Sequence, residues 1–371
     1  MNSVVPAGAR RRTDRHRLPV TAVQRLTEQA VAVTLGVPEA LRDTFAHRPG
    51  EHVIVRHHRA DGELRRSYSV CPPPGDPGAL RLVIKRGSPD GFGAHALTAL
   101  KAGDHLELTP PGGTFALPER TGGHHVLIAG GSGVTPLAAM AAGALRDDPD
   151  CRVSLVHSVP TAAEALLADE LALLKDAFVD RFTLLHVLTR EAGAALAGRI
   201  DAAGLARLLA ALDARPGPGT TFALCGPAGL TDTVRTALTE AGAAPEEIRS
   251  ELFTSGGVPA PAPVPGAPPG VPGAPPTANA TRITALYDGH RRVVTARPGE
   301  PTLLDALLRD HPDVPHACRE GICGSCRAKV VTGEVVTGLQ YALDGAQLAA
   351  GYTLTCRARP LGAEVTVDFD T

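Results

Sequence analysis

Residues 126–145 read VLIAGGSGVTPLAAMAAGAL, two apolar runs joined by a glycine turn, without a single charged residue. The stretch reaches the roughly 20 residues that a membrane span requires. Its central glycines and proline favour a strand, a tight turn and a helix instead. We therefore expect the first strand–helix unit of a parallel sheet here and no membrane span.

Downstream of this unit, apolar strands alternate with helical stretches. This alternation is typical of an α/β doubly wound parallel sheet, which we assign to residues 118–254. The expected strands are 126–129, 153–156, 182–188, 222–224 and 248–253. The expected helices are 136–145, 163–178, 202–212 and 230–241.

Upstream of the unit, short stretches alternate apolar and polar residues and are separated by turn residues. The expected strands are 30–37, 51–58, 65–71, 80–86 and 104–108, with a short helix at 94–100. Period-two alternation indicates an antiparallel barrel or sandwich, and we assign an antiparallel β-barrel to residues 17–117. Residues 1–16 are basic and lack the apolar core of a secretory signal, so we expect a disordered tail.

The glycines and prolines of the 371-residue chain gather in one segment. Residues 255–280 hold nine prolines, five glycines and no charge, as expected of an extended linker. Residues 281–371 then read as a small α+β domain, with a hairpin at 283–297, a helix at 302–311 and strands at 326–336 and 364–370. A net charge of −2 and 3% aromatic residues argue against a nucleic-acid partner.

Four of the seven cysteines lie in the last fifth of the chain. Three follow a Cys-x4-Cys-x2-Cys spacing and the fourth comes from a distant segment, which is the plant-type arrangement for a 2Fe–2S cluster. Gly321 and Gly324 would let the backbone curl around the cluster. A structural zinc site or unligated thiols are the alternatives. The candidate metal ligands are Cys318, Cys323, Cys326 and Cys356.

The cysteine loop and its surroundings, PHACREGICGSCRAK at 315–329, closely resemble the chloroplast-type ferredoxins. That resemblance covers the whole C-terminal domain and implies a β-grasp fold. A barrel followed by a parallel sheet, with Arg66-Ser67-Tyr68-Ser69 on a barrel strand, resembles the ferredoxin–NADP⁺ reductase superfamily. A solvated strand with one half-buried tyrosine is the alternative.

This second resemblance implies a flavin site. It places the ring of Tyr68 on the flavin, Ser69 near the flavin N5 and Arg66 on the phosphate, where a guanidinium fork is suited. The family's Gly-x-x-Ser turn is replaced by residues 90–95, DGFGAH, which lack the serine. We therefore expect FAD, with FMN as the alternative. The implied flavin-binding residues are Arg66, Ser67, Tyr68, Ser69, Ile84, Lys85, Gly91, Phe92, Gly93, Ala94 and Phe253.

The same resemblance implies a pyridine-nucleotide site made of two loops. Glycines after an apolar strand let a backbone approach a pyrophosphate, and the following helix offers its N-terminal N–H groups. The implied residues are Gly131, Gly133, Val134, Thr135, Pro136, Cys225, Gly226 and Pro227. A plain glycine turn and a core cysteine are the alternatives. The implied catalytic residues are Tyr68, Ser69, Cys225 and Glu251.

The preferred nucleotide can be argued from three further residues. In members that use NADPH, a Ser/Thr-Arg pair and another arginine hold the 2′-phosphate, and Thr189, Arg190 and Arg199 match them. Residues 158–161 contain no acidic side chain for a free 2′-hydroxyl. We therefore expect NADPH over NADH; two ordinary surface arginines are the alternative.

The order of the domains resembles the reductase components of multicomponent oxygenases. With the ferredoxin domain at the C-terminus, the chain is most similar to the reductases of phenylacetyl-CoA epoxidases. The resemblance implies an enzyme that passes electrons from NADPH through FAD and a 2Fe–2S cluster to an oxygenase component. Because we expect neither a secretory signal nor a membrane span, we expect this enzyme in the cytoplasm. The alternatives are a reductase for a ring hydroxylase, an acyl desaturase or a cytochrome P450, and a non-catalytic redox sensor. The 14 histidines show no metal-ligand spacing, and most are expected at the surface.

Overall fold

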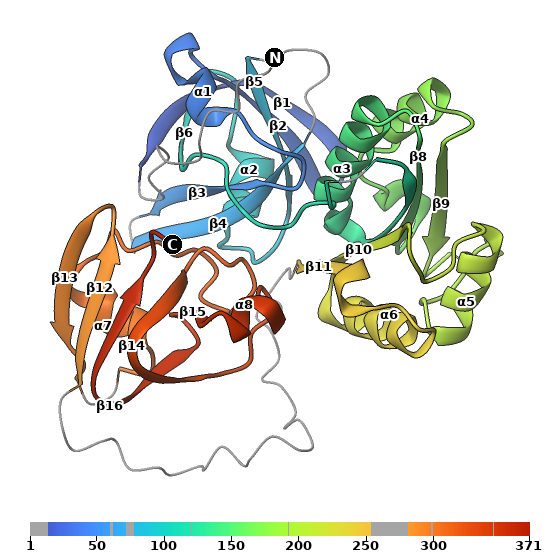
Figure 1. The fold of residues 1–371 in the computed structure, drawn as a ribbon. Coiled ribbons are helices and arrows are strands. Elements are labelled where there is room, and N and C mark those ends of the chain that lie inside the picture. Colours follow the sequence, from blue (N-terminus) through green and yellow to red (C-terminus); the bar gives the residue numbers. More distant parts are fainter. Residues whose placement is uncertain are drawn as a thin grey trace, which may run out of the picture. The chain divides into compact units, whose positions relative to one another are not determined.

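The computed structural model describes residues 14–59, 62–71, 78–119, 121–191, 193–253, 281–297, 300–343 and 345–371. The chain divides into two compact units, one from residue 16 to 256 and one that contains the C-terminal residues from 257 onward (Figure 1). The linker expected at 255–280 lies outside the described residues, as does the expected tail up to residue 13.

The first unit begins with a closed antiparallel barrel whose strand order is β1-β2-β5-β4-β3-β6. Its strands are β1 (His16–Thr27), β2 (Ala30–Gly36), β3 (His52–Arg59), β4 (Gly62–Cys71), β5 (Ala79–Lys85) and β6 (His105–Leu108). The helices η1 (Glu39–Leu41), α1 (Arg42–Phe45) and α2 (Phe92–Thr98) accompany them. Alternate apolar residues fill the barrel, and Leu18, Val33, Val53, Leu82 and Leu108 are fully buried.

The second half of this unit is a five-stranded sheet of order β11-β10-β7-β8-β9, with every pairing parallel. Its strands are β7 (Gly123–Gly130), β8 (Cys151–Val159), β9 (Phe182–Leu188), β10 (Thr220–Gly226) and β11 (Ile248–Leu252). Its helices are η2 (Gly131–Gly133), α3 (Val134–Asp147), η3 (Ala162–Glu164), α4 (Ala168–Ala177), α5 (Ala202–Ala211), α6 (Ala228–Glu240) and η4 (Pro245–Glu247). Within the described ranges, no helix is long and apolar enough to cross a bilayer.

The barrel and the sheet share one apolar core. Ala32, Cys71 and Val83 on the outside of the barrel pack in the same cluster as Leu137 and Met140 of α3. An ion pair crosses the same boundary, because Arg81 of β5 lies 2.5 Å from Glu170 of α4 although the arginine is only 4% exposed. The buried guanidinium depends on this carboxylate for its charge partner, so the ion pair and the shared core both tie the barrel to the sheet.

The C-terminal unit is a mixed sheet of order β13-β12-β16-β14-β15 with α7 packed on it. Its elements are β12 (Arg282–Tyr287), β13 (His290–Thr295), α7 (Leu303–Asp310), β14 (Arg327–Thr337), α8 (Gly345–Ala349), β15 (Tyr352–Leu354) and β16 (Ala358–Asp368). Thr302 caps α7, because its hydroxyl accepts the N–H of Asp305. The expected fold classes are therefore confirmed in all three parts of the chain.

Some local expectations differ from the structure. The first barrel strand, β1, was not expected, and α4 begins at Ala168 and not at residue 163, since Leu167 adopts a left-handed φ of 57°. The expectation that most histidines lie at the surface is wrong. His124, His125 and His157 are buried, and seven others are partly buried.

Candidate functional site

The two glycine loops meet at the carboxyl edge of the parallel sheet. The chain leaves β7 toward β8 on one side and β10 toward β11 on the other, and ligands of such sheets bind at this reversal. A Cβ on Gly133 would lie 2.1 Å from the Cys225 carbonyl oxygen, and one on Gly226 would lie 2.9 Å from the Gly130 Cα. Both positions therefore require glycine for the loops to touch.

The turn between β7 and α3 has the features of an anion site. Gly131 has a φ of +54°, and no atom lies within 4 Å of the place where its Cβ would be. The N-terminus of α3 has no side-chain cap, and the Thr135 hydroxyl donates to the Ser132 carbonyl at 3.0 Å. Such a helix start offers N–H groups and a favourable dipole to a phosphate. Val134 and Pro136 form the buried first turn of the helix.

One row of side chains crosses the sheet just below these loops. The strand registers pair Glu251 with Cys225, Cys225 with Ala129, Ala129 with His157, and His157 with His186. Residues paired in this way share one face of a sheet. The row therefore joins two predicted catalytic residues to two histidines that the sequence did not single out.

Buried polar atoms without a partner lie where the barrel meets this row. The Ser69 hydroxyl and the Glu251 Oε2 are both buried, and neither has a hydrogen-bond partner within the described part of the chain. Ser69 is the cross-strand neighbour of His52, whose Nδ1 lies 3.9 Å from the Glu251 Oε1. Buried polar atoms normally have a partner, so these atoms fit a polar cofactor edge such as that of a flavin.

Burial determines the protonation states of Glu251 and Cys225. It raises the pKa of Glu251 to about 8. It also raises the pKa of Cys225, and the nearby Glu251 raises it further. Both side chains are therefore held neutral near pH 7, as hydrogen-bond donors rather than as anions.

The Glu251 carboxyl predicts a pH dependence of stability. Its folded pKa of about 8 lies above the ordinary 4.5. The contribution of the Glu251 carboxyl to the free energy of unfolding is therefore fully present below pH 4.5, and it is lost as the pH rises through 8. We expect the melting temperature of the wild type to fall relative to that of Glu251→Gln between pH 6 and pH 9. Thermal denaturation of both proteins checks this, with the exposed Glu240→Gln as control; parallel curves for Glu251→Gln and wild type would contradict it.

Five of the predicted flavin residues come together at the start of α2. The rings of Tyr68 and Phe92 lie 5.9 Å apart, and burial raises the pKa of Tyr68. A Cβ on Gly93 would lie 2.4 Å from the Lys85 carbonyl oxygen, so only glycine allows α2 to approach the end of β5. Gly91 is the N-cap of α2 and offers no side chain to it. The donors of this turn are therefore backbone N–H groups, which suits a phosphate.

Most of the other predicted flavin residues lie on β4, β5 and α2, whereas Phe253 directly follows β11. Ile84 is buried in β5, Ser67 is half-buried in β4, and Ala94 follows Gly93 in α2. Arg66 is exposed and donates to the carbonyl of Arg65. The backbone N–H of Phe253 donates to the Gly226 carbonyl at 2.9 Å, and its ring packs against the shared core.

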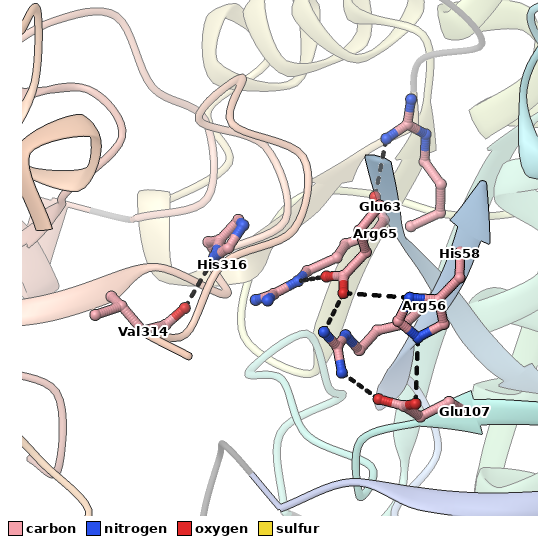
Figure 2. A network of polar contacts seen from close by, with 8 residues as sticks. Arg56, His58, Glu63, Arg65, Glu107, Val314 and His316 are labelled. Carbon is pink, nitrogen blue, oxygen red and sulfur yellow. Dashed lines mark hydrogen bonds and ion pairs between the residues drawn. The ribbon is translucent and has the colours of Figure 1, made fainter. Parts of the chain in front are cut away.

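An ion-pair network supports the strand that carries these residues (Figure 2). Arg56 of β3 bonds to Glu63 of β4 and to Glu107 of β6, and Arg65 also donates to Glu63. Burial alone would raise the pKa of Glu63, but the hydrogen bonds from both arginines outweigh it and lower the pKa to about 2. The network ties three barrel strands together beside Arg66, and sequence analysis did not foresee it.

The predicted 2′-phosphate residues follow β9. The N–H groups of Thr189 and Arg190 donate to the carbonyls of Val159 and Pro160, and Leu188 bridges to Ala197. This folds the segment back on itself and places Arg199 just after the bridge. Both guanidinium groups are exposed, and the described residues give neither an ion-pair partner.

The four C-terminal cysteines form two pairs. A hydrogen bond from the Cys323 thiol and backbone N–H groups, including that of Glu320, lower the pKa of Cys318 to about 6. Cys326 is in hydrogen-bond contact with Cys356, and this contact together with burial raises the pKa of Cys326. Gly321 and Gly324 have φ values of +77° and +67°, as a loop curling around its centre needs.

The pairing matches what an iron–sulfur cluster requires of its ligands. A plant-type 2Fe–2S cluster has two irons, each held by two thiolates. The donor set fits the cluster: Cys318 with Cys323 and Cys326 with Cys356 would hold one iron each.

Comparisons with known proteins cover the same three regions. Family models match for an oxidoreductase FAD-binding domain at residues 17–117, an oxidoreductase NAD-binding domain at 127–236 and a 2Fe-2S iron-sulfur cluster binding domain at 286–361. One of the subunits of 1,2-phenylacetyl-CoA epoxidase from Escherichia coli is 33% identical over 96% of this chain and 98% of its own. The ferredoxin reductase component of 3-ketosteroid-9-alpha-monooxygenase from Rhodococcus rhodochrous is 31% identical over 95% and 96%.

A solved structure shares the fold along nearly the whole chain. Phthalate dioxygenase reductase superposes with a TM-score of 0.55 at 21% identity and covers 96% of this chain and 98% of its own. At this identity the likeness concerns the arrangement of the chain alone.

Proposed function

This chain belongs to the ferredoxin–NADP⁺ reductase superfamily, among the members that carry a C-terminal 2Fe–2S domain, and from that premise we propose which electrons it moves and to what acceptor. It is an oxidoreductase with FAD, pyridine nucleotide and a 2Fe–2S cluster as its redox groups. The proposal is that NADPH is the donor and that an oxygenase component resembling phenylacetyl-CoA epoxidase is the acceptor. The 33% identity to a component of that epoxidase over nearly the full chain supports it.

The site geometry supports electron transfer from the nucleotide to the flavin and then to the cluster. A flavin accepts two electrons as a hydride and releases them singly, the form in which a 2Fe–2S cluster takes them. Gly131, Gly133 and α3 would bind the nucleotide phosphates, Cys225 would lie beside the nicotinamide, and Phe253 would contact the flavin. Ser69 and Glu251 would hydrogen-bond the polar edge of the flavin and hold a proton there. Their buried, unpaired oxygen atoms are the observation that carries this proposal.

We propose the same boundaries for the parts as the sequence suggests: a flavin barrel at 17–117, a nucleotide domain at 118–254, a linker at 255–280 and a ferredoxin domain at 281–371. A cytoplasmic location belongs to the proposal. The three cysteines outside the proposed cluster, Cys71, Cys151 and Cys225, are unpaired thiols and support it, since reduced thiols persist in that compartment.

A steady-state assay with two acceptors tests the function. With NADPH as donor, the purified protein is expected to reduce ferricyanide and also cytochrome c, a one-electron acceptor that takes its electrons from the cluster. Adding the oxygenase component of a phenylacetyl-CoA epoxidase system is expected to produce NADPH oxidation coupled to its substrate. A protein that binds both cofactors yet reduces no acceptor would instead fit a redox sensor.

Arg190→Ala tests the choice of NADPH. Losing one charge-assisted hydrogen bond to the 2′-phosphate costs about 1.5–3 kcal/mol, so the KM for NADPH should rise roughly 10- to 150-fold. The KM for NADH should hardly change, and kcat should be kept, because the 2′-phosphate is remote from hydride transfer. Steady-state kinetics with both nucleotides measure this, with the exposed Arg207→Ala as control. Equal, small changes for both nucleotides, or a wild type that prefers NADH, would refute the assignment.

A further inference from the structure

His157 lies directly beneath the turn that is proposed to bind the nucleotide phosphates. It is 0% exposed at the end of β8, and its Nε2 lies 3.0 Å from the carbonyl oxygen of Gly131. Its neighbours in the row across the sheet are Ala129 and His186. This fully buried imidazole therefore makes its hydrogen bond to the turn.

The direction of this hydrogen bond follows from its chemistry. A carbonyl oxygen can only accept, so the Nε2 of His157 carries the proton and donates. Burial lowers the pKa of His157 to about 4, and the nearby His186 and Lys85 add to the lowering, so the ring is neutral. In the neutral ring the Nδ1 is a bare acceptor, and it has no partner within the described residues. The side chain thus bears an unpaired buried nitrogen while it holds one carbonyl in place.

The direction of the Gly131 carbonyl fixes the orientation of the Gly131–Ser132 peptide plane. In a trans peptide the C=O and the N–H point in opposite directions, and the described chain contains no cis peptide. The Gly131 carbonyl also accepts the N–H of Val134, so two donors hold it on the protein side of the turn. The N–H of Ser132, at the other end of the same peptide, consequently points away from His157. A reversed plane would present a carbonyl oxygen to an incoming phosphate.

We propose that His157 is a positioning residue for the pyrophosphate of the pyridine nucleotide, which acts by fixing the Gly131–Ser132 peptide with its N–H toward the ligand. The inference rests on the proposed function, since it requires a nucleotide at this turn. The hydrogen bond from His157 matters here because Gly131 has a φ of +54° and open space around it. A glycine in this position has no side chain that would restrict the orientation of the Gly131–Ser132 peptide plane.

A pair of variants separates this role from ordinary packing. His157→Leu keeps an apolar side chain of similar size and removes the donor, whereas His157→Gln retains an N–H donor of similar reach. We expect the Kd for NADP⁺, measured by calorimetry on the flavin-loaded protein, to rise about 10-fold or more in His157→Leu. Glutamine should recover most of this loss. The KM for NADPH should follow the Kd, while kcat at saturation changes far less, because positioning of a remote phosphate contributes to binding.

The neighbouring histidine provides the matched control. His186 lies next to His157 in the row but makes no bond to the turn, so His186→Leu should leave the Kd for NADP⁺ unchanged. Equal affinities for wild type and His157→Leu, or equal losses in the leucine and glutamine variants, would overturn the inference. Because the wild type is measured alongside, a failure of the proposed function is distinguishable: the wild type itself would then bind no NADP⁺. Flavin content and melting temperature of each variant identify any that fails to fold, and the glutamine variant decides in that case.

Discussion

Cys323→Ser is expected to abolish the 2Fe–2S cluster while the flavin remains bound. Cys323 is one of the thiols of the Cys318–Cys323 pair, and its loss would leave one iron with a single thiolate ligand. The iron content should fall from about two per chain to nearly none. Cytochrome c reduction by NADPH should fall to near background, since it requires the cluster. Ferricyanide reduction should persist, because the flavin and nucleotide sites belong to the other compact unit.

Iron analysis, the visible spectrum and the two acceptor assays measure this result. Cys151→Ala is the matched control, because Cys151 lies in β8 of the first unit and is not one of the four predicted ligands. It should retain the iron, the flavin and both activities. An unchanged iron content in Cys323→Ser would refute the ligand assignment.

Gly133→Ala is expected to give the second large effect, on reduction of the flavin by NADPH. The added methyl group would lie 2.1 Å from the Cys225 carbonyl oxygen, a backbone atom that cannot move without shifting β10. The nucleotide turn must therefore retreat from the Cys225 loop. A misplacement of about 1 Å can cost about 100-fold in rate, and we expect a loss of that order in kcat/KM. Flavin and iron contents should stay as in the wild type.

Stopped-flow measurement of flavin reduction tests this, with Gly229→Ala as control. Gly229 lies in α6, a little beyond the second loop, and has no atom within 4 Å of where its Cβ would be. Alanine there should leave the rate unchanged and slightly increase stability, as usual for a helical glycine with room for a side chain. Wild-type rates in Gly133→Ala would mean that the contact between the two loops does not matter for the nucleotide.

The sequence predicted the fold and the candidate site wherever the relevant residues form a short local motif. The Cys-x4-Cys-x2-Cys loop and the strand–glycine–helix unit at 126–145 each carry spacing and residue type together, and they predicted both the fold and the candidate loops. The β1 strand was missed because its sequence, HRLPVTAVQRLT, lacks a regular alternation of apolar and polar residues. Its pairing with β2 and β6, and not its own pattern, makes it a strand.

The residues that sequence analysis missed depend on partners far along the chain. His157 is one of several polar residues in β8, and nothing nearby in sequence marks its bond to Gly131. His52 approaches Glu251, about 200 residues later, only after the barrel and the sheet have packed together. Arg81 and Glu170 present the same difficulty. Single residues with distant partners leave no local signal, so only the tertiary structure identifies them.

The shared core between barrel and sheet also limits how the chain can be recombined with its relatives. A chimera joined at residue 117 would place a foreign helix against Ala32, Cys71 and Val83 and would leave Arg81 without Glu170. An unpaired buried charge of this kind is strongly destabilising. Nucleotide specificity is therefore better transplanted as the short segment 189–199, whose arginines are exposed, than as a whole domain. The barrel and the sheet must therefore be exchanged together. A different nucleotide donor of electrons is best introduced by changing the exposed segment 189–199.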